Sequence, residues 1–116
     1  MNVGLLLRLE GLALFVAALV LYFDAGYSWL LLILLILAPD LSFLAYAAGP
    51  RVGAALYNSF HNMVLPIALG IVGVLGDSRL ATAIALIWLA HIGIDRALGY
   101  GLKYPTAFKD THIQRV

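Results

Sequence analysis

Four long apolar windows, separated by short clusters of glycine and polar residues, set the pattern of this chain. A helix needs roughly 20 residues to cross the hydrocarbon core of a bilayer, which is about 30 Å thick. Windows of that length lie at about residues 3–23, 28–48, 53–75 and 79–98. Each ends at a turn-forming cluster, the last of them at 99–101. The pattern predicts an all-α protein, a four-helix transmembrane bundle with up-down topology. Residues 1–116 form one transmembrane domain in this prediction, with 99–116 as an interfacial tail.

Composition agrees with a membrane protein and excludes several other classes. The chain has 116 residues, of which 64% are hydrophobic and 11% charged, and its mean hydropathy is +1.01. Soluble domains carry roughly 25% charged residues. A net charge of +1 with scattered basic residues gives no indication of a nucleic-acid partner. The absence of cysteine excludes disulfides and thiol catalysis. The expected partner is therefore the lipid bilayer.

The basic residues that flank the windows predict the orientation of the chain. Cytoplasmic loops retain an excess of Lys and Arg. With four spans, the N-terminus, the middle loop and the C-terminus face the same side. That side holds Arg8, Arg51, Arg96, Lys103, Lys109 and Arg115, whereas only Arg79 falls on the other. We therefore expect a multi-pass protein with both termini in the cytoplasm.

Ionisable side chains inside the windows are the main candidates for chemistry. They are Glu10, Asp40, His61, His91 and Asp95. A charged group near the bilayer centre costs about 2.5–3.5 kcal/mol on insertion scales, so three unpaired carboxylates would cost roughly 7–10 kcal/mol. Counted at about 1.5 Å per residue from the cytoplasmic ends, all five lie roughly 6–13 Å deep. Each predicted helix therefore delivers a polar group to the same layer, and we expect these groups to compensate one another.

Helix periodicity and two prolines point to the same layer. His91 and Asp95 are spaced i, i+4 and share one face of the fourth helix. Asn58 and His61, spaced i, i+3, share a face of the third. Pro39 precedes Asp40, and Pro66 leaves the carbonyl of residue 62 without its helical donor. Irregular backbone at membrane depth is tolerated where it is buried in protein or lines a wet cavity.

One interpretation of this cluster is a metal-dependent membrane hydrolase. Helix bundles that bind metals take carboxylates and histidines from several inward faces, and mixed imidazole and carboxylate ligands suit Zn, Mn or Fe. The predicted ligands are His61, His91 and Asp95, with Asp40 as a fourth ligand or a bridge. A bound ion would activate water for attack on a lipid or another membrane-soluble ester. Glu10 is the predicted general base, and Asn58 or Tyr57 is predicted to orient the substrate.

Three other interpretations remain open at this stage. The cluster can relay protons or bind a transported solute, which for so small a bundle requires a homo-oligomer. The nearly complete lack of polar residues in the outer halves of the windows argues against transport. His61 and His91 can serve as axial ligands of a haem. Finally, Arg8 and Arg96 can neutralise two of the acids in an ordinary ion-pair network.

Several segments also resemble a known family. They are Leu-Arg-Leu-Glu-Gly at 7–11, Ala-Pro-Asp-Leu-Ser at 38–42 and, above all, the stretch from Ala90 to Tyr104 that begins Ala-His-Ile-Gly-Ile-Asp-Arg. The chain is similar over nearly its whole length to a family of small bacterial integral membrane proteins catalogued as a domain of unknown function. The resemblance implies a location in the bacterial inner membrane and implies no reaction.

Overall fold

The computed structural model describes residues 2–99, and every regular element in that part of the chain is a helix. In order, the elements are α1 (Val3–Asp24), α2 (Trp29–Leu35), the 3-10 helix η1 (Ala38–Ala48), α3 (Pro50–His61), α4 (Val64–Leu75) and α5 (Arg79–Ala97). Apart from Gly99, the predicted interfacial tail lies outside the described residues.

Four stretches of these helices are long and apolar enough to cross a membrane. They are Val3–Asp24, Trp29–Ala48, Pro50–Leu75 and Arg79–Ala97. Many large apolar side chains on them face outward; Val64 is 73% exposed and Leu75 is 80% exposed. Water would make such a surface costly, whereas lipid tails cover it without penalty. The prediction of an all-α protein with four helices long and apolar enough to span a membrane is confirmed, whereas the up-down topology stays a prediction. Which side of the membrane the termini face stays a prediction.

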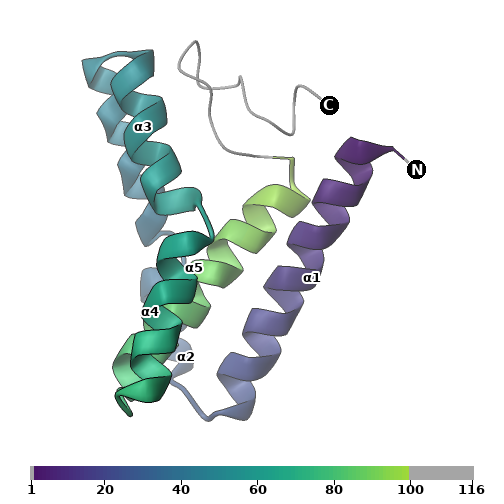
Figure 1. Cartoon of the computed structure of the whole chain (residues 1–116), viewed down its shortest axis with the longest axis vertical. Coiled ribbons are helices and arrows are strands. Elements are labelled where there is room, and N and C mark those ends of the chain that lie inside the picture. Colours follow the sequence, from purple (N-terminus) through teal and green to yellow (C-terminus); the bar gives the residue numbers. More distant parts are fainter. Residues whose placement is uncertain (1, 100–116) are drawn as a thin grey trace.

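Helix α5 packs against both α1 and α4. Figure 1 shows α1 and α5 side by side, with α4 on another side of α5. The 3-10 helix η1 packs against α3, and these two form an arm beside the others. Gly49, with a φ of 111°, makes the turn between η1 and α3 in a conformation that favours glycine. Helix α5 is thus the element that connects the rest of the fold.

Glycines set the close approach of α5 to its neighbours. A Cβ added to Gly11 of α1 would lie 2.8 Å from the carbonyl oxygen of Gly93, and one on Gly93 would lie 2.6 Å from the amide nitrogen of Phe15. The two backbones therefore touch, as small residues permit in membrane helices. Gly73 of α4 meets Thr82 in the same manner. These glycines pack helices within the chain, and a homo-oligomer stays a prediction.

The second span is not one continuous α-helix, because Pro39 interrupts it. Proline has no amide proton, so the carbonyl of Leu35 loses its helical donor. After α2 ends, the amide of Asp40 donates to the carbonyl of Leu37, 3.0 Å away, in the tighter 3-10 pattern. The carbonyl of Ile36, which Asp40 would engage in an α-helix, is thereby left for another donor.

The third span also breaks, at Asn62, between α3 and α4. Asn62 has an extended backbone with a ψ of 157°. Its side-chain nitrogen donates to the carbonyls of Asn58 at 2.8 Å and Ser59 at 2.9 Å. Its side-chain oxygen accepts from the amides of Val64 at 2.9 Å and Leu65 at 3.2 Å. One amide group therefore caps the end of α3 and the start of α4. The sequence predicts a continuous helix here, and the missing amide proton of Pro66 accounts for the difference.

Candidate metal centre

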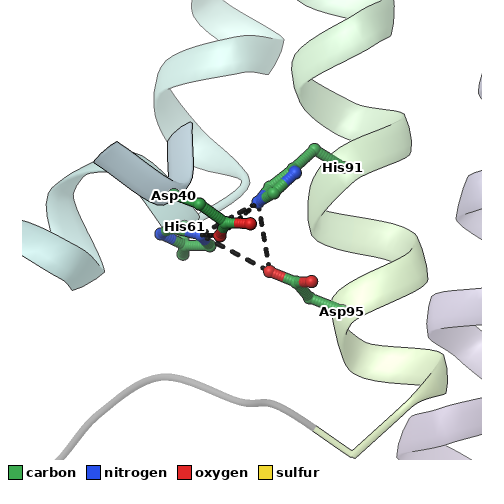
Figure 2. A group of neighbouring side chains, drawn as sticks. All are labelled: Asp40, His61, His91 and Asp95. Atoms are coloured by element: carbon green, nitrogen blue, oxygen red, sulfur yellow. Dashed lines mark hydrogen bonds and ion pairs between the residues drawn. The ribbon is translucent and has the colours of Figure 1, made fainter. Parts of the chain in front are cut away.

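Four side chains from three elements converge on one point at the breaks in the second and third spans. Asp40 comes from η1, His61 from the last residue of α3, and His91 and Asp95 from one face of α5. Each contributes one ligand atom, and these four atoms lie within 4.8 Å of one another. Figure 2 shows both imidazoles and both carboxylates turned toward the common centre.

Five of the six distances among the four ligand atoms are close to those of a tetrahedral metal site, and the sixth, between the two carboxylate oxygens, is within 4.8 Å. Nε2 of His61 lies 3.0 Å from Nε2 of His91. The Oδ1 atom of Asp40 lies 3.1 Å from the first nitrogen and 3.0 Å from the second. The Oδ2 atom of Asp95 lies 3.4 Å and 3.1 Å from them. Tetrahedral ligands at Zn bond lengths of 2.0–2.2 Å would be roughly 3.3–3.6 Å apart. Small outward shifts would therefore seat an ion.

Two backbone carbonyls fix which nitrogen of each histidine faces the centre. Nδ1 of His61 lies 2.8 Å from the carbonyl oxygen of Tyr57, and Nδ1 of His91 contacts the carbonyl oxygen of Ile36. A carbonyl oxygen only accepts hydrogen bonds, so each Nδ1 carries a proton and donates it. In a neutral ring Nε2 then presents its lone pair to the centre. Metal-binding histidines are typically oriented in this way.

This arrangement concentrates acceptors where water has little access. The side chains of His61 and His91 are 4% and 1% exposed, Asp95 is 16% exposed, and Asp40 is 41% exposed. Two neutral imidazoles and two carboxylates carry a net charge of −2. Lone pairs that face one another in a poorly solvated site are costly unless a cation or extra protons lie between them. One divalent ion would neutralise the group.

Helix α5 also satisfies the carbonyls that the break at Asn62 releases. In a continuous helix the amides of Val64 and Leu65 would bond to the carbonyls of Phe60 and His61, but they bond to the side chain of Asn62. Trp88 Nε1 donates to the carbonyl of Phe60, and Arg96 donates to that of His61 at 3.4 Å. The break that presents His61 is therefore held in place by α5.

An aromatic ring further restrains His61. The ring of Tyr57 stacks on the imidazole with centroids 3.6 Å apart and an interplanar angle of 5°. Tyr57 is itself buried, with 4% of its surface exposed. The imidazole of His61 is thus held on one face by stacking and at Nδ1 by a carbonyl, so its Nε2 has a fixed direction.

Two further predicted site residues do not belong to this group of four. Glu10 has an exposed side chain on α1, and its electrostatic partner is Arg96. Asn58 lies one turn before His61, is half-buried, and lends its backbone carbonyl to the side chain of Asn62. The catalytic roles of Glu10 and Asn58 stay predictions.

The geometry also bears on the haem and ion-pair interpretations of the histidines and acids. A haem would need the two Nε2 atoms on opposite sides of the iron, roughly 4 Å apart at ordinary metal–imidazole bond lengths, and they lie 3.0 Å apart. The separation of the Nε2 atoms does not support the haem interpretation, which stays a prediction. Asp40 and Asp95 pair with the two histidines, while Arg96 bonds to a backbone carbonyl.

Some contributors to the site were not identified from the sequence. Asn62 and Trp88 hold the broken backbone, and the carbonyl of Ile36 orients His91. The sequence does contain a signal for Asn62, because it stands four residues before Pro66. Proline has no amide proton, so the carbonyl of Asn62 loses its helical hydrogen bond. Trp88, three residues before His91, shares its helix face.

Comparison with known proteins gives one match. The family described as a domain of unknown function (DUF4260) matches residues 4–116, nearly the whole chain. No match was found among curated proteins or among solved structures. The match supports the resemblance to a family of unknown function, whereas the bacterial origin and the membrane nature of that family stay predictions.

Proposed function

The chain belongs to the DUF4260 family, whose function is not defined, and from its site we propose that it is a membrane protein that binds a divalent transition metal and uses it to hydrolyse a membrane-soluble ester. The proposed ligands are Asp40, His61, His91 and Asp95. Zn is the first candidate, and Mn and Fe are the others. We propose the bacterial inner membrane as its location.

One observation carries the proposal: two Nε2 atoms and two carboxylate oxygens face one centre, with both Nδ1 atoms bonded to carbonyls. In an ordinary ion-pair network, each histidine could pair with one carboxylate, and the four side chains would not have to face one common centre. Imidazolium protons on both Nε2 atoms would point at the same centre across a separation of 3.0 Å and would repel each other. The charge of −2 and the near-tetrahedral spacing both suit a single divalent ion.

The different exposures of the ligands support a catalytic interpretation. Catalytic zinc sites keep one position accessible to water, and structural sites are closed. His61 and His91 are buried, whereas the side chain of Asp40 is 41% exposed. Asp40 is therefore the ligand that water or substrate would displace, which would open the fourth position of the site. Asp40 also lies on the 3-10 helix η1, so it can shift without moving His91 and Asp95 on α5.

The proposed reaction adds water across an ester bond. A bound divalent ion supplies Lewis acidity and lowers the pKa of water. The water oxygen bonds to the acyl carbon, and the bond from that carbon to the alkoxy oxygen breaks. The proton that leaves the water is held by a carboxylate and passes to the alkoxy oxygen. Asp40 is placed to hold it, and Glu10 would do so only if its exposed side chain turned toward the site.

Elemental analysis tests the metal site. The protein is purified in detergent without chelators and without immobilised-metal chromatography, and its metal content is measured. We expect about one metal ion per chain, strongly reduced in Asp95→Asn and His91→Ala. Asp24→Asn is the matched control, because it makes the same chemical change at an exposed carboxylate at the end of α1. Glu10→Gln should likewise retain the metal.

An activity assay on the same samples tests the proposed hydrolysis. Hydrolysis of a fluorogenic fatty-acid ester should require the metal and should be lost in His91→Ala. Protein that holds no metal, and whose thermal stability does not change when Zn, Mn or Fe is added, would contradict the proposal. A proton relay or an ion-pair network would then be the better account of the cluster. Metal without hydrolysis would restrict the function to metal binding.

A further inference from the structure

An apolar pocket of about 290 Å³ lies beside the four ligands. Its lining comes from the end of α2, the start of η1, the end of α3 and the middle of α5. It includes Ala38, Pro39, Phe60, Ile84 and Trp88. The wall is formed by hydrocarbon and aromatic groups, and ligand pockets are typically concave and mostly apolar in this way.

Three of the elements that line this pocket, η1, α3 and α5, also carry the proposed metal ligands. Pro39 is followed by Asp40, and Phe60 is followed by His61. On α5, Ile84 and Trp88 stand seven and three residues before His91, which puts all three on one helix face. The pocket and the four proposed ligands are therefore formed by neighbouring residues of η1, α3 and α5.

The order of the two sections matches the order of groups in a membrane lipid. Moving from His91 toward the start of α5, the helix rises by about 5.4 Å per turn. The pocket begins one turn away in that direction and, with the predicted orientation, lies nearer the middle of the bilayer than the ligands. A lipid of the inner leaflet likewise has its esters near the interface and its chains toward the middle.

The pocket is also held in a defined shape. Trp88 Nε1 donates to the carbonyl of Phe60, and the rings of these two residues lie 6.2 Å apart between centroids. The hydrogen bond ties the α5 wall to the α3 wall. A preformed site reduces the entropic cost of ordering a flexible hydrocarbon chain.

We infer that this pocket binds the hydrocarbon chain of the substrate, so that the ester of a single-chain or double-chain lipid lies at Asp40, His61, His91 and Asp95. This inference rests on the proposed function, and it adds the substrate class and the place where the chain binds. The ligands recognise the ester, and Phe60, Ile84 and Trp88 recognise its apolar chain.

Fluorescence of Trp88 can test the inference, because the chain has two tryptophans and Trp88 lies in the pocket wall. Trp29→Phe leaves Trp88 as the sole tryptophan. The probe is the methyl ester of dibrominated stearic acid, whose bromines quench a tryptophan only at contact. In detergent micelles we expect quenching that saturates as the share of the probe in the micelle rises.

Variants that fill the pocket provide the comparison. Ala38→Leu fills it from η1 and Ile84→Phe from α5, and both should abolish the saturable quenching. Ile67→Phe is the matched control, since it fills a different apolar pocket of about 590 Å³ between α1, α4 and α5. This control should quench like the parent. Metal content is measured on every sample.

The outcomes separate this inference from the proposed function. Quenching that rises linearly with the probe, or that is equal in Ile84→Phe and Ile67→Phe, overturns the inference even if the metal is present. Saturable quenching that only the filling variants abolish supports it. If that pattern occurs in protein that holds no metal, the chain-binding pocket stands and the proposed metal function fails.

Discussion

The Nε2 atoms of His61 and His91 lie 3.0 Å apart, although the residues come from different helices and are 30 positions apart in the sequence. Their rings are tilted by 60° to each other, and each is bonded through Nδ1 to a different backbone carbonyl. Two imidazoles in this relationship, with two carboxylates at the same centre, form a group that could hold a metal ion.

The carbonyl contacts predict a specific tautomer for both histidines. In Zn-loaded protein, nitrogen-15 NMR spectra of labelled histidine should show a protonated Nδ1 and a metal-bound Nε2 for two of the three histidines. Alanine substitution of His61 and His91 assigns the two signals, and His112 supplies an internal reference. A proton on Nε2 of either His61 or His91 in the loaded protein would rule out the proposed coordination.

Asn62 should be important for both stability and metal affinity. Its side chain makes four hydrogen bonds that cap α3 and α4, so Asn62→Leu should destabilise the protein by about 1–2 kcal/mol, the usual range for a lost cap. Because His61 is the neighbouring residue, metal affinity should fall as well. Thermal unfolding in detergent and zinc titration measure the two effects.

The control for Asn62 is Ser59→Ala. The hydroxyl of Ser59 bonds to the carbonyl of Ala55 at 2.8 Å within the same helix, and the backbone carbonyl of Ser59 that accepts from Asn62 is unchanged in this variant. This variant should bind zinc like the parent. An Asn62→Leu variant with the affinity of the parent would show that the break does not depend on this side chain.

The contact between α1 and α5 should not tolerate even a methyl group. In Gly93→Ala, the new Cβ would lie 2.6 Å from the backbone nitrogen of Phe15 and 2.7 Å from the carbonyl of Gly11. The helices must separate, at a cost of about 1–3 kcal/mol by analogy with overpacked cores. Unfolding by heat or by denaturing detergent should reveal the loss.

Gly70→Ala is the matched control for that prediction. A Cβ at Gly70 would lie 3.5 Å from the Cβ of Ala85, an ordinary van der Waals contact. This glycine is also helical and also faces α5, so the two variants differ mainly in available space. Equal stabilities for Gly93→Ala and Gly70→Ala would contradict the close approach of α1 and α5.

Much of the fold follows from the sequence because its cause is local. The apolar windows are long enough to span a bilayer, and the cost of burying charge selects five residues, of which the structure brings four together in Figure 2 and leaves out Glu10. Pro39 and Pro66 similarly mark the two spans that break, since the loss of an amide proton acts on the residue four positions earlier.

Other features of the site could not be predicted from the pattern of apolar and polar residues. Glu10 has the right depth, but depth gives only the position along a helix and not its direction around the axis. Helix α1 is apolar on all sides, so no polar stripe indicates which face turns inward. The roles of Asn62 and of the Ile36 carbonyl arise only once the backbone has broken and released hydrogen-bonding groups.

X-ray absorption spectroscopy at the zinc edge tests the central claim most directly, on protein loaded with zinc and then freed of excess metal. The account predicts one retained zinc ion with two imidazoles and oxygen ligands at about 2.0–2.2 Å. It also predicts that His91→Ala removes one imidazole from the spectrum. A spectrum without imidazole, or zinc that washes out of the intact protein, would contradict the account.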